Sequence, residues 1–317
     1  MGKVKHSSPN NDKAIVAVFF LIPTLMLILG YFLFPSSYSP SDQPFVYIPL
    51  FLGLILLGIG FLWKGKKKTA SKLKIVGWGA FTFFWALMPS FLYCSEGGDV
   101  FNAAVSIAGV YVLLYIAYHE WLSIQRKEHP SCLNWIAGGT FLAGIIYFTV
   151  DSGLIPELKN GLIDVVAVHS TALLKFLGVQ AFKQGHIIVY KGTPITIIFA
   201  CTAIQATVLF VGMIGALGNA HLKRKILALM ITVIPIYFLN LVRNASVVFL
   251  VGGNITSFFM AHNVLSKIGA LLTLIALLFI TFKIVPELFD EISCLFDLPK
   301  RKGPVEIFFR SLLEKTP

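Results

Sequence analysis

The chain has 317 residues, of which 56% are hydrophobic and only 13% are charged, and its net charge is +11. Its mean hydropathy is +0.80. Because a soluble domain carries about a quarter charged residues, this composition excludes a soluble globular protein and places the chain in a bilayer.

Eight apolar stretches are each long enough to cross the ~30 Å hydrocarbon core of a bilayer. Backbone amides in lipid need internal hydrogen bonds, so these stretches are expected to be helices. The sequence therefore predicts an all-α fold, a polytopic membrane helical bundle of about eight transmembrane helices with a small extracytoplasmic cap. In chain order, the expected spans are Ala14–Phe34, Val46–Trp63, Ile75–Tyr93, Val100–Tyr118, Leu133–Val150, Thr196–Leu217, Ile226–Val242 and Val264–Val285.

These spans divide the chain into four segments. Residues 1–150 hold five N-terminal transmembrane helices, and residues 151–195 form the extracytoplasmic cap. Residues 196–285 hold the three helices that carry the candidate chemistry, and residues 286–317 form a cytoplasmic tail.

The distribution of lysine and arginine predicts the orientation. Fourteen of them lie in the N-terminal tail and in the second, fourth and sixth connections, whereas Pro35–Phe45 and Cys94–Asp99 on the other side contain none. Cytoplasmic loops carry the excess of positive residues, so both termini are expected in the cytoplasm of a multi-pass cell-membrane protein. The basic residues then serve topology and contact with the inner leaflet, and no nucleic-acid partner is indicated.

The four cysteines do not predict a disulfide framework. On the expected topology Cys94 and Cys201 face outward, while Cys132 and Cys294 face the cytoplasm. No pair has the CxxC spacing of a metal or thioredoxin-like site. The sequence therefore indicates no metal and no cofactor.

The long outer connection Asp151–Ile195 is expected to have structure of its own. Leu154–Leu177 has the apolar pattern of a helix, with a proline in its first turn and a glycine after its end. Val179–Phe182 and His186–Lys191 are separated by three turn-forming residues and predict a hairpin. An ordinary structured loop is the alternative to a functional cap.

Three polar residues fall in one outer layer of the predicted bundle. Cys201 lies at the start of the sixth span, Arg243 at the end of the seventh and His262 just before the eighth. Taken singly, each has a simple structural explanation: a packing cysteine, a snorkelling arginine and a hydrogen-bonded histidine. Together, a thiol, a fixed cation and an imidazole suit covalent acyl transfer.

Sequence blocks around these residues resemble the archaeosortase/exosortase family. The blocks are Ala200-Cys201-Thr202-Ala203-Ile204-Gln205, Asn240-Leu241-Val242-Arg243-Asn244 and Ala261-His262-Asn263. The resemblance covers roughly Leu154 to Val285 and is closer to archaeal than to bacterial members. Ala203 is a departure, since a glycine is common there in the family.

The resemblance implies a membrane-embedded, sortase-like cysteine protease and transpeptidase. Family members process secreted or surface proteins that end in a short motif, a transmembrane helix and a basic tail, and they transfer the new C-terminus to a membrane lipid through a thioester. Carried onto this chain, Cys201 is the nucleophile, Arg243 the family's arginine and His262 the third polar residue. The active site would face outward.

Physical chemistry gives these residues compatible roles. Arg243 stays protonated, so it suits the oxyanion rather than base catalysis. His262 can pass a proton to the leaving amine and then activate the acceptor. Gln205, one turn after Cys201, can donate a further hydrogen bond to the substrate, and His169 on the cap helix is the reserve base.

Two other functions fit the sequence less closely. A transporter or membrane binding protein would use Arg243 and His262 for an anion or proton pathway, but no inverted repeat or pair of broken helices is evident. A membrane assembly factor would have no chemistry at all.

Overall fold

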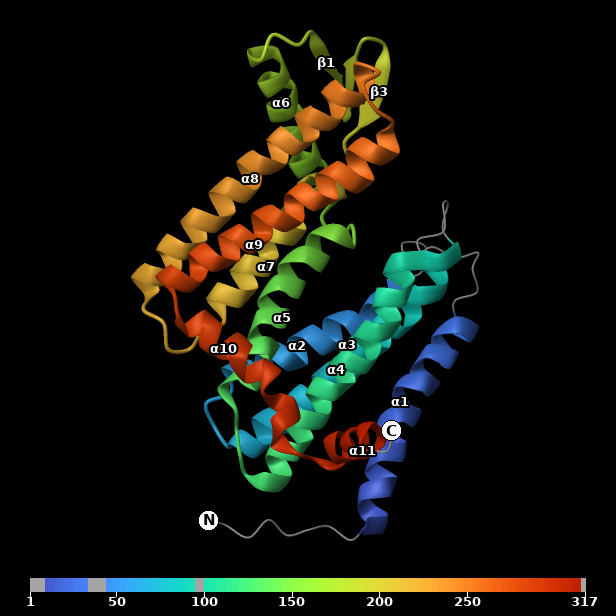
Figure 1. Cartoon of the computed structure of the whole chain (residues 1–317), viewed down its shortest axis with the longest axis vertical. Helices are drawn as coiled ribbons and strands as arrows, with labels where there is room; N and C mark the ends of the chain where they lie inside the picture. Colours follow the sequence, from blue (N-terminus) through green and yellow to red (C-terminus); the bar gives the residue numbers. More distant parts are fainter. Residues whose placement is uncertain (1–8, 34–43, 95–99, 315–317) are drawn as a thin grey trace. The chain divides into compact units, whose positions relative to one another are not determined.

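The computed structural model describes residues 9–33, 44–94 and 100–314. The chain divides into two compact units, Met1–Phe141 with Asp290–Pro317, and Leu142–Phe289. Figure 1 shows that nearly all of the described chain is helical, with one small sheet. The all-α membrane architecture predicted from the sequence is therefore confirmed, and the four-segment division stays a prediction.

The predicted number of eight spans is wrong for the described part of the chain, where six helices are long and apolar enough to cross a membrane. The other two apolar helices are shorter. The six are α1 (Pro9–Leu33), α3 (Lys67–Cys94), α4 (Val100–Arg126), α5 (Ser131–Asp151), α8 (Leu222–Gly252) and α9 (Ser266–Ile284) extended by the π-helix η4 (Phe259–Leu265).

The two short helices lie where full spans were expected. α2 (Tyr47–Leu62) has 16 residues and α7 (Ile204–Gly215) has 12. At ~1.5 Å per residue they are roughly 24 and 18 Å long, less than the ~30 Å hydrocarbon core. α7 starts eight residues after Thr196, the predicted start of the span, because the first part of this apolar run is not helical. A strand, an extended stretch and the 3₁₀ turn η3 (Phe199–Cys201) occupy those residues.

The first unit is a bundle in which α2, α3 and α4 pack in sequence order. A glycine allows the close approach of α2 to α3, since a Cβ on Gly53 would lie 2.6 Å from the backbone nitrogen of Phe81. An ion pair joins α3 to α4 in the interior: Lys74 Nζ lies 2.6 Å from Glu120 Oε1, and both side chains are buried. Paired in this way, two charges can stay inside an apolar bundle.

The C-terminal residues form α10 (Glu287–Phe296), the 3₁₀ turn η5 (Leu298–Arg301) and α11 (Pro304–Leu313). Within the first unit, Glu306 on α11 accepts a hydrogen bond of 2.7 Å from the Tyr115 hydroxyl on α4.

A disulfide joins Cys132 and Cys294, which corrects the expectation of no disulfide framework. Sequence spacing missed this pair because the two cysteines are 162 positions apart.

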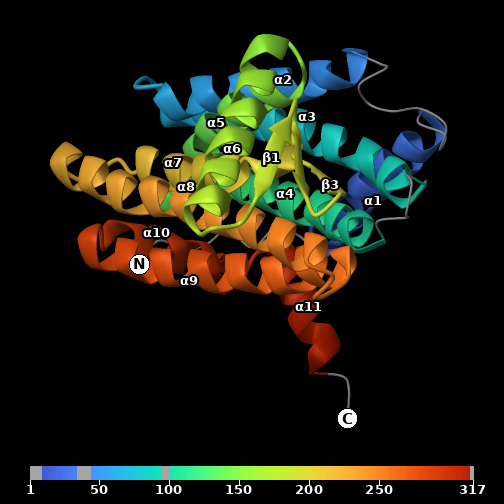
Figure 2. The same cartoon turned by 90° about the horizontal axis from the view of Figure 1, so that it is seen from above.

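In the second unit, the cap consists of α6 (Pro156–Phe176) and a three-stranded antiparallel sheet, β1 (Ala181–Gln184), β2 (Ile187–Tyr190) and β3 (Thr193–Thr196). Seen from above, α6 lies beside the sheet (Figure 2). The predicted helix and hairpin are confirmed. The third strand was not predicted: Thr193–Ile195 fell at the end of the expected cap, and Thr196 was assigned to the following span.

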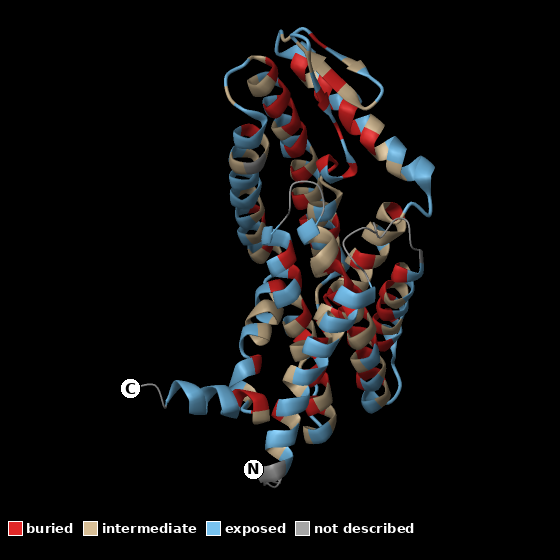
Figure 3. Ribbon diagram, turned by 90° about the vertical axis from the view of Figure 1, so that its right-hand side faces the viewer, coloured by how far each residue is buried: buried red, intermediate tan, exposed pale blue. Residues whose placement is uncertain are grey.

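Apolar side chains join the cap to the helices of its unit. Ile163 and Leu174 of α6 share one buried cluster with Ile188 of β2 and with Leu241 and Val248 of α8. Figure 3 shows buried residues on the sheet and on the helix beside it. Burying these side chains stabilises the unit, and it fixes the cap against the C-terminal half of α8.

Helix α8 extends ten residues beyond Val242, the predicted end of its span. The extension packs on the sheet, where the Phe249 and Tyr190 rings stack with centroids 6.1 Å apart. Gly252 lets the helix pass closely, since a Cβ there would lie 2.7 Å from a ring carbon of Tyr190. The predicted span ended before the polar residues Arg243 and Asn244. Contact with the sheet stabilises the helix beyond them.

Candidate active site

Cys201 sits in a sharp turn between the sheet and α7. The turn is a single 3₁₀ element, Phe199–Cys201, and the Thr202 hydroxyl closes it by donating to the carbonyl of Phe199 at 2.7 Å. The Cys201 side chain is a free thiol, 6% exposed, and belongs to the buried cluster shared by α6, the sheet and α8. The thiol therefore lies in a dry, apolar environment.

Ala203 gives this turn its shape. It has φ of 61° and ψ of 8°, in the left-handed region, and it immediately precedes α7. A non-glycine residue there costs of order 1–3 kcal/mol. Glycine adopts this conformation freely, which explains why a glycine suits this position and why alanine is tolerated only under constraint from the surrounding structure.

Two buried asparagines of α8 bind the backbone of Cys201. Asn240 Nδ2 donates to the Cys201 carbonyl oxygen at 2.7 Å, and Asn244 Nδ2 donates to the same oxygen at 3.0 Å. The two side chains lie one turn apart on one face of the helix. The cysteine turn is thereby attached to the segment of α8 that carries Arg243.

Arg243 lies between these asparagines in the sequence and projects into a cavity. Its Nε atom is buried and has no hydrogen-bond partner among the described residues. It precedes Gly252, the last residue of α8, by nine positions, which is about 13 Å. The expectation that Arg243 lies at the end of its helix is therefore wrong, because the contact with the sheet lengthens α8.

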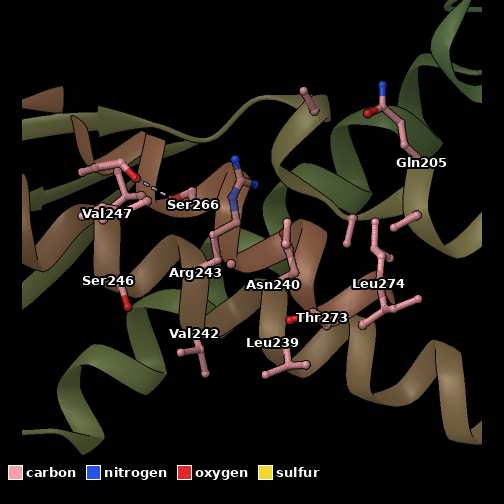
Figure 4. A pocket seen from close by; sticks show the side chains of 18 of the residues that line it. Gln205, Leu239, Asn240, Val242, Arg243, Ser246, Val247, Ser266, Thr273 and Leu274 are labelled. Atoms are coloured by element: carbon pink, nitrogen blue, oxygen red, sulfur yellow. Dashed lines mark hydrogen bonds between the residues drawn. The ribbon is translucent and has the colours of Figure 1, made fainter. Parts of the chain in front are cut away.

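The cavity is formed by α7, α8 and α9 and has a volume of about 690 Å³. Figure 4 shows Arg243, Asn240 and Gln205 among its lining side chains. Ala200 and Ala203, on either side of Cys201 and Thr202, also line it. No acidic residue lines it in the part of the chain that the structure describes, so Arg243 sets a positive potential there.

His262 lies in the π-helix η4 that leads into α9. Its ring stacks on Phe258 with centroids 5.0 Å apart and planes 9° apart. The imidazole is within electrostatic range of the Arg243 guanidinium. π-helical turns are often found at functional sites, and this one replaces the simple helix start expected from the sequence.

The structure places Gln205 and His169 with tyrosine partners. Gln205 Nε2 donates to the Tyr147 hydroxyl at 2.9 Å, and the Gln205 side chain lines the cavity. His169 on α6 contacts the Tyr237 hydroxyl on α8 through Nδ1 at 2.6 Å. His169 is absent from the described lining of the cavity, so the hydrogen bond to Tyr237 is its only described role.

The predicted residues are thus brought together in part. Arg243 and Gln205 line one cavity, the Arg243 charge acts electrostatically on His262, and the Cys201 backbone is bound to both sides of the Arg243 segment. No hydrogen bond joins the Cys201 thiol to Arg243 or His262 within the described residues. The asparagine pair was missed, although two asparagines in an apolar span are themselves a signal of function.

Comparison with known proteins identifies the family. The sequence profile of the transmembrane exosortase family matches residues 41–282. The chain belongs to this family. Archaeosortase A of Haloferax volcanii is 24% identical over 265 residues, covering 72% of this chain and 84% of that protein. Archaeosortase A of Natronomonas pharaonis is 24% identical over 275 residues, covering 75% and 84%. No solved structure matches the chain.

Family membership agrees with the resemblance found in the three sequence blocks. The match begins after the first expected span and includes the second, third and fourth, which resembled the family only in their hydrophobicity, so it extends the likeness to residues before Leu154. This exosortase-family chain is a multi-pass membrane protein with six apolar helices of spanning length in its described residues.

The asparagine pair provides a direct test of how this exosortase-family protein positions its cysteine. Replacing Asn244 by leucine removes one donor and leaves the Cys201 carbonyl bound by Asn240 alone. Small misplacements of a reacting group can cost about 100-fold in rate, so we expect kcat for substrate cleavage to fall about 10- to 100-fold with KM little changed.

The matched control is Thr232→Val on the same helix, where the hydroxyl donates to the carbonyls of Ala228 and Leu229 in the preceding turn. Its cleavage rate should equal that of the wild type. Equal kcat values for Asn244→Leu and Thr232→Val would show that the asparagine has only a structural role.

Proposed function

We propose that this protein is a cysteine transpeptidase that cleaves a C-terminal sorting signal from secreted proteins and transfers the new C-terminus to a membrane lipid through a thioester. Its substrates carry a short motif, a transmembrane helix and a basic tail. Both chain termini lie in the cytoplasm, and the active site faces outward. Family membership and the two relatives named archaeosortase A support this assignment.

The observation that carries the proposal is the pair of hydrogen bonds from Asn240 and Asn244 to the Cys201 carbonyl. They hold the thiol-bearing turn against the helix segment that projects Arg243 into the cavity. A nucleophile and a fixed cation on two rigidly joined elements suit the stabilisation of a tetrahedral intermediate.

In the first half-reaction, the Cys201 thiolate attacks the carbonyl carbon of the scissile peptide bond. Arg243 donates hydrogen bonds to the oxyanion that forms, and His262 passes a proton to the leaving amine. The peptide C–N bond breaks, and the substrate's new C-terminus remains as a thioester on Cys201.

In the second half-reaction, an acceptor amine or hydroxyl attacks the thioester carbonyl, His262 takes its proton, and the thiol is released. The burial of Cys201 favours transfer over hydrolysis, because water has little access to a side chain that is only 6% exposed. Gln205 lines the cavity beside this position and contributes a hydrogen bond to the bound substrate.

The thioester provides the test. We expect that purified protein incubated with a secreted protein of this tripartite type, and quenched with acid, carries the substrate's new C-terminal segment on the Cys201 peptide. Mass spectrometry detects the added mass, and neutral hydroxylamine should remove it. An unmodified Cys201 peptide under conditions where the substrate is cleaved would contradict the mechanism.

A further inference from the structure

The cavity between α7, α8 and α9 extends well beyond Arg243, and the acylation chemistry assigns no role to this further part. Its described lining continues to Leu209, Ile236 and Leu274, which are apolar and lie toward the end of α8 that is farther from the sheet. Several lining residues, including Leu239 and Ala270, are exposed. The cavity therefore opens sideways, toward the surface that the bilayer covers.

Its length matches one leaflet of a bilayer. Along α8 the lining runs from Leu250 to Ile236, which is about 21 Å at ~1.5 Å per residue. Half of a bilayer of ~40–45 Å, including headgroups, is about 20–22 Å thick. A transmembrane helix needs the full hydrocarbon core of ~30 Å, so the cavity is too short to hold one along its whole span.

The charge of the lining indicates the headgroup. Arg243 is the one charged residue in the described lining, and its Nε is buried without a partner. A guanidinium has five N–H donors in a planar fork that matches a phosphate. These donors allow one arginine to bind a phosphate and also to donate to an oxyanion. An occupant with a phosphate at one end and apolar chains at the other complements this cavity.

We propose that the cavity between α7, α8 and α9 binds the acceptor lipid, a phosphate-bearing membrane lipid whose phosphate lies at Arg243 and whose chains extend toward Ile236 and Leu274. This proposal rests on the proposed transpeptidase function. Ala200 and Ala203, which flank Cys201 and Thr202 in the sequence, line the same cavity, so the proposed lipid site adjoins the turn that carries the cysteine.

The transfer step balances without any further reactant. The headgroup amine or hydroxyl attacks the thioester carbonyl carbon, and a new C–N or C–O bond forms. The C–S bond breaks with its electron pair going to sulfur. The proton of the acceptor moves through His262 to the sulfur, which regenerates the Cys201 thiol. The products are the lipid-linked protein and the free enzyme.

Filling the cavity tests the proposal. In Ala270→Phe an aromatic ring enters the cavity from α9. The matched control is Ala276→Phe, the same change at an exposed position of the same helix that is not among the described lining residues. Both variants are reconstituted in phosphatidylethanolamine vesicles with a tripartite substrate, and the Cys201 thioester and the lipid-linked product are measured separately.

We expect lipid-linked product to form at least 10-fold more slowly in Ala270→Phe than in Ala276→Phe, with thioester accumulating in the first. Loss of the thioester itself in Ala270→Phe would show that the cavity holds the protein substrate instead. Equal product formation in the two variants would also overturn the proposal. A wild-type enzyme without any thioester would contradict the proposed function rather than the cavity assignment.

A second measurement tests the phosphate. Vesicles of a neutral, phosphate-free diglycosyl diacylglycerol are doped with equal amounts of phosphatidylethanolamine or of a long-chain alkylamine that lacks the phosphate. Transfer to phosphatidylethanolamine should be at least 10-fold faster. Equal transfer to the two amines would show that Arg243 does not bind a phosphate.

Discussion

Replacing Cys201 with alanine should abolish the release of the sorting signal, and serine at this position should restore less than about a thousandth of the activity. The side-chain oxygen of serine is a far weaker nucleophile without a base in contact, and loss of a catalytic nucleophile in hydrolases costs 10³-fold or more. The measurement is the fraction of a tripartite substrate that is shortened, read by immunoblot in cells that express each variant at equal membrane levels.

Cys94→Ser is the matched control, because Cys94 is the other free cysteine in the described residues and is exposed at the end of α3. It should process substrate at the wild-type rate. Removing the small Cys201 side chain leaves at most a minor cavity, so membrane levels should be normal. Substrate processing by Cys201→Ala would exclude a cysteine nucleophile and favour an assembly factor without chemistry.

Replacing Arg243 with lysine should lower kcat for cleavage by about 10²–10³-fold, although the positive charge is kept. Loss of one oxyanion donor typically costs this much, and the lysine ammonium cannot reproduce the planar fork of the guanidinium. The measurement is single-turnover formation of the Cys201 thioester with purified variants, which isolates the step that forms the oxyanion.

The control is the same substitution near the N-terminus of the same helix. Arg224 forms a hydrogen-bonded ion pair with Glu287, far along α8 from Cys201. Arg224→Lys should form the thioester at the wild-type rate. If Arg243→Lys forms the thioester at the wild-type rate, only the positive charge of Arg243 is needed, and its planar guanidinium is not. That outcome would fit the rival function, an anion pathway through the membrane, better than oxyanion stabilisation.

The membrane architecture could be predicted from the sequence because hydrophobicity and length are local properties. Six expected spans correspond to helices of spanning length in the described chain. α7 could not be predicted in the same way, since Thr196–Leu217 is uniformly apolar and hydropathy does not distinguish a strand from a helix. Pairing of Thr193–Thr196 with β2 takes these residues into the sheet, and this pairing depends on contacts between segments.

The choice of residues also came from the sequence, while their arrangement did not. Cys201, Arg243 and His262 stand out because polar groups are rare and costly in apolar segments, and their sequence blocks resemble the family. The distance of Arg243 from the end of its helix was misjudged, because the extension of α8 packs on a sheet that is distant in the sequence: Tyr190 precedes its stacking partner Phe249 by 59 positions.

The sequence by itself therefore determined the membrane location, the family and the choice of candidate site residues, because each depends on residue type and short motifs. Only the tertiary structure decided that Asn240 and Asn244 bind the Cys201 carbonyl and that Arg243 projects into the cavity between α7, α8 and α9. Both depend on how α7, α8 and α9 pack, and the angle and depth of helix packing are set by many side chains together.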